Sequence, residues 1–109
     1  MLNKSQRLLF ERQAEIARAM AHPLRIAIIN FLKDGEQCVC DIAKNVGSER
    51  SNVSRHLSLM ANAGLLESRK DGLKVIYKLK YTCIVDFFAC VGNVLKQQAR
   101  DSKELLKVL

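Results

Sequence analysis

The sequence lacks every kind of segment that would carry it into or across a membrane. No apolar run approaches the roughly 20 residues that a transmembrane helix needs. Lys4 and Arg7 precede no apolar segment with a small-residue cleavage site, so we expect no secretory signal peptide. These absences predict a cytoplasmic protein with no membrane partner. Its four cysteines are expected to be reduced thiols, because disulfide frameworks belong to exported chains.

Tryptophan is also absent, and aromatic residues make up only 6% of the 109 residues. Segments with period-two alternation are scarce, whereas apolar residues recur at helical spacing over long stretches. Hydrophobic residues account for 49% of the chain and charged residues for 27%, a composition typical of a folded globular protein that excludes disorder. Length and composition therefore predict one mainly helical domain over residues 1–109.

Acidic residues are in the minority, with 11 against 18 basic ones and a net charge of +7. The excess is concentrated in one stretch. Between residues 50 and 80, seven basic and two acidic residues give a local net charge of +5. Such a concentration favours a polyanionic partner such as nucleic acid.

Apolar periodicity predicts a first helix over residues 5–20, which His22-Pro23 interrupts. Proline suits the first position of the next helix, so His22 is expected at its start. Gly35 is the predicted C-cap of this second helix. Its predicted buried stripe comprises Leu24, Ala27, Ile28, Phe31 and Leu32.

Two short helices separated by a glycine-containing turn are predicted over residues 38–64, which is the signature of a helix-turn-helix. Gly47 ends the first helix, Ser48 is the predicted N-cap of the second, and Glu49 suits its first turn. The predicted apolar stripes are Val39, Ile42, Ala43 and Val46 in the first helix, and Val53, Leu57, Met60 and Ala61 in the second.

A β-hairpin is expected over residues 65–80. Residues 65–69 and 73–80 flank Lys70-Asp71-Gly72, and alternation around Asp-Gly is a strong hairpin signal. A hairpin that follows a helix-turn-helix is a wing. The expected fold class is therefore mainly α with a small β-hairpin, a winged helix-turn-helix.

A long last helix is expected over residues 82–107. The first and last helices carry more apolar surface than a small core needs. We therefore expect a homodimer formed through these two helices, with residues 82–107 as the C-terminal dimerisation helix.

The outward face of the second helix in the helix-turn-helix is predicted to contact DNA. At about 100° per residue, the side opposite Val53 is small and polar, unlike ordinary solvated faces rich in Glu and Lys. Arginine on such a face binds guanine through two hydrogen bonds, and first-turn residues reach phosphates or bases. The predicted contacts of this helix are Arg50, Ser51, Asn52, Ser54, Arg55, His56 and Ser58.

His56 lies beside the apolar stripe, so a packing or hydrogen-bonding role is expected for it in preference to base contact. In the wing, Arg69, Lys70 and Lys74 are placed to contact the phosphate backbone. Phosphate contacts give affinity and salt dependence without choosing a sequence.

The four cysteines fall into two pairs. Cys38 and Cys40 form a Cys-x-Cys at the start of the helix-turn-helix, and soft thiolates suit soft metals and metalloids. Residues two apart on a regular helix do not face each other, so these two share a ligand only if Cys38 lies outside the helix or the first turn opens. Cys83 and Cys90 are seven residues apart on one helix face, about 10 Å, which exceeds the roughly 7 Å limit for a disulfide. They are either sensing thiols or apolar fillers of the dimer seam.

Taken together, these segments resemble the ArsR/SmtB family of metal-sensing repressors over about residues 15–80. The resemblance rests on Ala21-His22-Pro23-Leu24-Arg25, Cys38-Val39-Cys40-Asp41-Ile42-Ala43, Ser51-Asn52-Val53-Ser54-Arg55-His56-Leu57, Gly64-Leu65-Leu66 and Lys70-Asp71-Gly72. It implies a homodimer that binds double-stranded operator DNA and releases it when an inducer binds. By resemblance to the arsenite and cadmium/lead branches, Cys38 and Cys40 are inducer ligands. The inducer is arsenite or a soft metal ion (cadmium, lead or zinc), and no permanent cofactor is implied.

The resemblance leaves a third ligand unassigned. Arsenite sensors of this type often carry another cysteine where this chain has Ala43, and cadmium/lead sensors use N-terminal cysteines, of which residues 1–37 contain none. The zinc-type site uses Asp and His of the last helix, which here has no His. Cys83 and Cys90 are the remaining thiols. A thiol-redox or persulfide-sensing repressor of the same fold stays an alternative, as does a ligand-independent DNA-binding protein.

A thiol enzyme such as a reductase is the alternative from a different class. A nucleophilic cysteine needs a general base nearby. The chain has only two histidines, His22 and His56, and both have structural explanations. No enzymatic activity is therefore expected.

Overall fold

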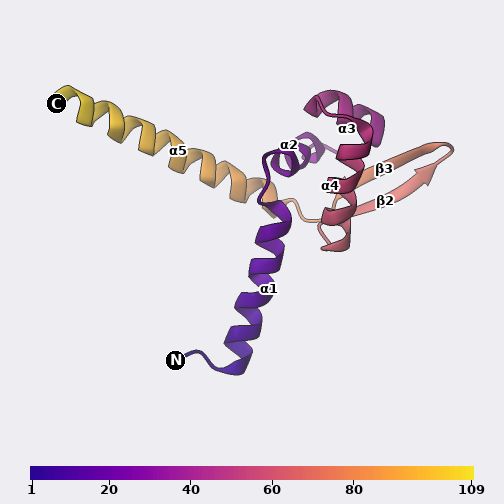
Figure 1. Cartoon of the computed structure of the whole chain (residues 1–109), viewed down its shortest axis with the longest axis horizontal. Helices are drawn as coiled ribbons and strands as arrows, with labels where there is room; N and C mark the ends of the chain where they lie inside the picture. Colours follow the sequence, from indigo (N-terminus) through magenta and orange to yellow (C-terminus); the bar gives the residue numbers. More distant parts are fainter.

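The computed structural model describes residues 1–109 as five helices and three strands. The helices are α1 (Lys4–Met20), α2 (Pro23–Leu32), α3 (Val39–Val46), α4 (Arg50–Asn62) and α5 (Cys83–Val108); the strands are β1 (Gln37–Cys38), β2 (Leu66–Asp71) and β3 (Lys74–Leu79). α2, α3 and α4 form a central body from which the β2–β3 hairpin projects on one side (Figure 1). α1 and α5 leave the body in other directions, and the molecule measures 61 × 42 × 22 Å.

Local hydrogen bonds set where the first two helices begin. The Asn3 side chain accepts a hydrogen bond from the Gln6 N–H at 2.8 Å, and the Gln6 side chain accepts one from the Asn3 N–H at 3.0 Å, forming a capping box. His22 is the N-cap of α2, and its Nδ1 accepts a hydrogen bond from the Leu24 N–H at 3.0 Å. Pro23 at the first helical position needs no acceptor for an N–H. The predicted break between these helices is confirmed.

The buried side of α2 differs from the predicted stripe. Ala27 is exposed, whereas Ile29 is only 1% exposed. The helix packs against α1, α3, α4, α5 and β3, so its neighbours decide which of its nearly continuous apolar residues are covered. The prediction for Gly35 is also wrong. Lys33 caps α2, and Gly35 lies in the following turn at φ 145°, where its N–H donates to the Leu32 carbonyl at 3.3 Å.

α3 and α4 form the predicted helix-turn-helix pair. Val53, Leu57 and Met60 of α4 are fully buried in a core shared with α2 and α3. Gly47 is the C-cap of α3 in the left-handed conformation (φ 68°), which favours glycine.

The N-cap of α4 is one residue later than predicted. Glu49 occupies this position and makes no side-chain capping bond. The hydroxyl of Ser48, which was the expected cap, instead accepts a hydrogen bond from the Asn52 Nδ2 at 2.9 Å. The side chain of Ser48 therefore ties the turn to the first turn of α4.

The wing is part of a three-stranded antiparallel sheet in the order β1-β3-β2. The two-residue strand β1 was not predicted, and it moves Cys38 out of α3 into the sheet, where Cys38 also serves as the N-cap of α3. The hairpin limits also differ from the prediction. Asp71 pairs with Lys74, so Gly72 and Leu73 form the turn. Leu73, which was predicted to begin the second strand, is fully exposed at the tip.

α1 and α5 leave a large apolar surface uncovered. Of α5 only Ile84 is buried, with Val85 and Phe88 packed partly against the core. The exposed large apolar residues of the two helices are Leu8, Leu9, Phe10, Ile16, Phe87, Val91, Val94, Leu95, Leu105, Leu106 and Val108. An isolated helix with such a face is only marginally stable in water, because most helical stability comes from packing an apolar face.

Candidate nucleic-acid interface and thiol site

The outer side of α4 is exposed and polar, as the sequence predicted. Ser51, Arg55 and Ser58 are exposed and Ser54 is half-buried, while the opposite side of the helix lies in the core. A shallow, open depression of about 510 Å³ follows this side. It is lined by Ser54, Arg55, Ser58, Leu59 and Asn62. The helix thus presents small side chains and one guanidinium group on its exposed side.

A chain of hydrogen bonds positions the guanidinium group of Arg55. Its Nη2 donates to the Asn52 Oδ1 at 2.7 Å, and the Asn52 Nδ2 donates to the Ser48 hydroxyl at 2.9 Å. Asn52 was predicted as a direct DNA contact. In the structure its side chain is engaged on both sides and holds Arg55.

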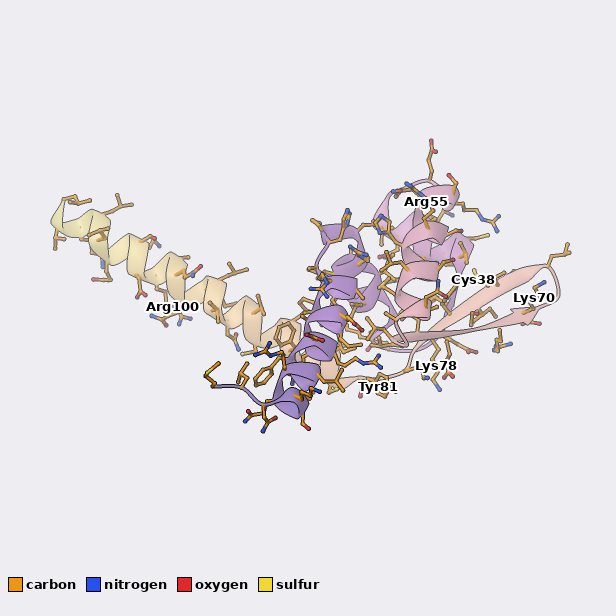
Figure 2. All side chains as sticks on the ribbon, turned by 60° about the horizontal axis from the view of Figure 1, so that its bottom comes forward. Cys38, Arg55, Lys70, Lys78, Tyr81 and Arg100 are labelled. Atoms are coloured by element: carbon orange, nitrogen blue, oxygen red, sulfur yellow. The ribbon has the colours of Figure 1, made fainter.

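The wing carries three basic residues that were predicted to contact phosphates, and they differ in whether a carboxylate already binds them. Lys70 and Lys74 are exposed, and neither makes a salt bridge. The backbone of Lys74 pairs with that of Asp71 beside the hairpin turn, and Figure 2 shows Lys70 near the tip. Arg69 is paired. Its Nη2 and Nε donate to Glu36 at 2.6 and 3.2 Å, and its Nη1 lies 4.0 Å from Asp71. The hydrogen bond from Arg69 lowers the pKa of Glu36 and raises that of Arg69. Glu36 was missed because 33 residues separate it from its partner.

The Cys-x-Cys is split between two elements. Cys38 is buried at 9% exposure in β1, at the wing side of the body, whereas Cys40 is exposed in the first turn of α3 (Figure 2). Cys38 therefore lies outside the helix, which is one of the two conditions under which both sulfurs can share a ligand. Cys83 and Cys90 are exposed on α5, which leads away from the body.

A complete metal site does not form within one chain, since no three side chains among His, Cys, Asp and Glu come together. The structure thus brings Cys38 and Cys40 to one region and does not bring Cys83 or Cys90 to them.

The rings of His22 and His56 lie close together at a tilt, a contact that the sequence did not predict. Their ring centroids are 4.5 Å apart and the rings are tilted by 43°. Burial lowers the pKa of His56, and electrostatic interaction with His22, Arg25 and Arg55 lowers it further. His56 packs against His22, and its contact with DNA stays a prediction. Its partner was missed because 34 residues separate the two rings in sequence.

None of the helices is both long and apolar enough to cross a membrane.

The family described as "Bacterial regulatory protein, arsR family" matches residues 22–68. The uncharacterized HTH-type transcriptional regulator Rv0081 of Mycobacterium tuberculosis is 31% identical over 102 residues, which cover 93% of this chain and 90% of that protein. Two solved structures share the fold with a TM-score of 0.77. NolR from Sinorhizobium fredii is 26% identical, covering 86% of this chain and 94% of that one. The homodimeric winged helix-turn-helix DNA-binding domain Mb0332 from Mycobacterium bovis is 25% identical, covering 92% and 93%.

Two relatives are named for resistance to metals or metalloids. The cadmium resistance transcriptional regulatory protein CadC homolog of Staphylococcus aureus is 37% identical over 67 residues, which cover 61% of this chain and 55% of that protein. The arsenical resistance operon repressor of Escherichia coli K12 is 36% identical over 66 residues, which cover 60% and 56%. The chain therefore aligns with about half the length of these two proteins.

The helix-turn-helix body, the three-stranded sheet with its wing and the exposed face of α4 define a winged helix-turn-helix DNA-binding protein. This chain belongs to the arsR family of bacterial regulatory proteins, and it is a transcriptional regulator. The relatives named above are all regulators of transcription by name.

Proposed function

We propose that the chain is a homodimeric repressor whose α4 enters the major groove of operator DNA. The polarity of α4 carries this proposal: one side is fully buried, and the opposite side is small and polar around Arg55. Small hydroxyl side chains let the helix approach base edges closely, and an arginine donates two hydrogen bonds to a guanine. The proposed base-contacting residues are Ser51, Ser54, Arg55 and Ser58.

Phosphate contacts flank this face. Arg50 in the first turn of α4 and the exposed Lys70 and Lys74 of the wing supply positive charge without a competing carboxylate partner. Arg69 contributes only when it leaves Glu36, because both sides of its guanidinium group already bind carboxylates. Such contacts fix the position of the protein on DNA, whereas base contacts choose the sequence.

A second copy of the chain is the proposed partner of α1 and α5. Exposed apolar patches of this extent usually mark an interface, and both helices carry one. The similar domain from Mycobacterium bovis is homodimeric. A twofold dimer would present two copies of α4, and a separation of about 34 Å would match successive major grooves on one side of DNA.

Cys38 and Cys40 are the proposed inducer site. Two thiols at the junction of β1 and α3 favour a soft, thiophilic ion such as arsenite, cadmium, lead or zinc. The names of the staphylococcal and Escherichia coli relatives support this class of inducer. With arsenite, each sulfur–arsenic bond would replace a hydroxyl of arsenous acid, which leaves as water with the thiol proton.

The sheet offers a route from this site to the DNA-binding elements. Cys38 pairs with Ile76 of β3, and the next residue begins α3. Pulling the buried Cys38 towards Cys40 would strain β1 against β3 at one end and α3 at the other. Sensing and DNA binding would then be coupled within residues 38–80.

Measuring release of DNA tests the proposal. A duplex is selected by the protein from a random library, and its binding is followed with arsenite, cadmium, zinc or an oxidant. We expect release by a soft ion in the native protein and in Cys83→Ser, and no release in Cys38→Ser. Failure to select any duplex would contradict the DNA-binding proposal, and release that is unchanged in Cys38→Ser would contradict the assignment of the site.

The second candidate is a thiol-redox or persulfide sensor of the same fold. The absence of a third ligand within one chain and the exposure of Cys40, Cys83 and Cys90 favour it. In the same experiment this candidate predicts release by the oxidant, reversal by a reducing agent and no response to arsenite, cadmium or zinc. A protein that binds DNA equally under every condition would be a ligand-independent DNA-binding protein.

A further inference from the structure

A pocket of about 580 Å³ lies between the start of α2 and one flank of α4. It is lined by His22, Arg25, Asn52, Arg55, His56 and Leu59. Four of these six side chains are basic and none is a carboxylate. The polarity of the lining therefore suits an anion.

The pocket is rich in hydrogen-bond donors, and one buried donor among them has no acceptor. Nδ1 of His22 already accepts a hydrogen bond from the Leu24 N–H, so in the neutral ring Nε2 carries the proton. Nε of Arg25 is buried and has no hydrogen-bond partner. Arg55 is held on the rim by Asn52 at 2.7 Å. A buried donor without a partner costs free energy, so an acceptor that entered the pocket would be favoured.

The electrostatic state of His56 agrees with this geometry. The groups that face it are His22, Arg25 and Arg55, and each of them disfavours a further positive charge. Together with burial they lower the pKa of His56, so the ring is mostly neutral at neutral pH while the pocket is empty. An anion bound among these groups would raise the pKa of His56 and so favour the protonated ring.

The pocket adjoins the proposed DNA-contacting face. With Val53 of α4 set at 0°, the proposed base-contacting residues lie at about 100–200°, and Asn52, Leu59 and His56 lie at about 240–300°. The two surfaces meet at Arg55, which lines both the open depression and this pocket. Backbone phosphates border the major groove on both sides of an inserted helix, and they are the anions nearest to its flanks.

We propose that the pocket of His22, Arg25 and His56, which Arg55 borders on its rim, binds one phosphodiester group of operator DNA beside α4. The inference rests on the proposed function, since it names a further contact of the same DNA complex. Because the bound phosphate stabilises protonated His56, binding of DNA takes up protons. Affinity for DNA is then highest in mild acid and falls as the pH rises from below 6.5, where the free ring titrates, through the higher pKa of His56 in the complex.

The test measures affinity for the selected duplex against salt concentration and pH. The variants are Arg25→Gln and His56→Gln, with Arg100→Gln as the control that removes one charge from α5, far from the pocket (Figure 2). We expect Arg25→Gln to lower the salt slope by about 0.9, the value for one lost phosphate contact. We expect His56→Gln to remove most of the pH dependence, and Arg100→Gln to behave as the native protein. Thermal melting identifies a variant that fails to fold.

Three outcomes separate the possibilities. If the native protein binds no selected duplex, the proposed function itself fails. If the native protein binds and both pocket variants keep its salt slope and pH dependence, only the pocket inference is overturned. NMR of the histidine rings distinguishes the source of phosphate: the duplex is expected to shift the signals of His22 and His56. A shift with inorganic phosphate and none with the duplex would make the pocket a site for a free anion and overturn the inference.

Discussion

Cys38 lies opposite Ile76 in the antiparallel pairing of β1 with β3, and Ile76 in turn lies opposite Arg69 of β2. The first cysteine of the Cys-x-Cys therefore belongs to the same sheet as the wing. The arrangement joins the proposed inducer site to both DNA-binding elements, since Cys38 is also the N-cap of α3.

Replacing Cys38 by serine is expected to separate sensing from DNA binding. A hydroxyl in this buried position costs about 1–3 kcal/mol of stability when it finds no partner, while the surface of α4 is untouched. DNA binding in the absence of inducer should persist, and arsenite should no longer release the duplex. Thermal melting and fluorescence anisotropy measure the two effects. Cys83→Ser is the control for sensing and should keep the native response to arsenite.

Substitutions of Arg55 and Lys70 are expected to weaken DNA binding in different ways. Arg55→Ala should cost about 1–3 kcal/mol on the selected duplex and weaken the preference for it over a scrambled one, because a base contact is lost. Lys70→Gln should weaken binding to both duplexes equally and lower the salt slope by about 0.9. Anisotropy titrations over a range of salt concentrations measure both. Equal losses on the two duplexes for Arg55→Ala would show that Arg55 does not choose the sequence.

The Glu36–Arg69 pair is expected to restrain DNA binding. Glu36→Gln removes the stronger carboxylate partner of Arg69, so its guanidinium group can turn to a phosphate, and the affinity for DNA and the salt slope should both rise. Arg69→Gln should lower them, or leave them unchanged if Glu36 never releases Arg69 in the complex. A fall in affinity in Glu36→Gln would contradict this role of the pair.

The same pair predicts a pH dependence of stability. The pKa of Glu36 is lowered in the folded protein, so the contribution of the pair is present at neutral pH and is lost as the pH falls through the lowered pKa, which lies below 4.5. The difference in melting temperature between the native protein and Glu36→Gln should therefore shrink in acid. Because both side chains are about half-exposed, the difference should be small and should weaken with added salt. A difference that grew in acid would have the wrong sign.

The apolar side of α5 is expected to hold the dimer together. Leu95 is 60% exposed in one chain, so Leu95→Glu should not disturb the fold of a monomer but should place a charge in the proposed interface. We expect a shift from dimer to monomer in analytical ultracentrifugation. Lys96→Glu adds the same side chain on the other side of α5 and is the control. If Leu95→Glu stays dimeric, the interface lies elsewhere.

The features that the sequence predicted correctly all depend on local patterns. The helical periodicity around Val53, Leu57 and Met60 located α4 and its buried side, and Gly47 marked the end of α3. His22-Pro23 marked the boundary between α1 and α2. Each of these signals is contained within a few residues, because helix periodicity and capping are local.

The features that the sequence did not predict depend on tertiary contacts. β1 is only two residues long, too short for an alternating pattern, and it exists because β3 offers it a partner. The pairing of Arg69 with Glu36 was not predicted because the two residues are remote in sequence. The sequence did not predict the basic pocket for the same reason, since His22 and His56 come into contact only when α2 packs against α4.

The central claim is that ligation of Cys38 and Cys40 and release of DNA from α4 are one coupled event. A single titration of arsenite into the protein–DNA complex tests it, with the ultraviolet absorption of thiolate–arsenic bonds and the anisotropy of the labelled duplex recorded in the same sample. The account predicts that both signals change together and reach their plateaus at the same arsenite concentration, and that Cys38→Ser loses both. Thiolate–arsenic bonds that form fully while the duplex stays bound would contradict it.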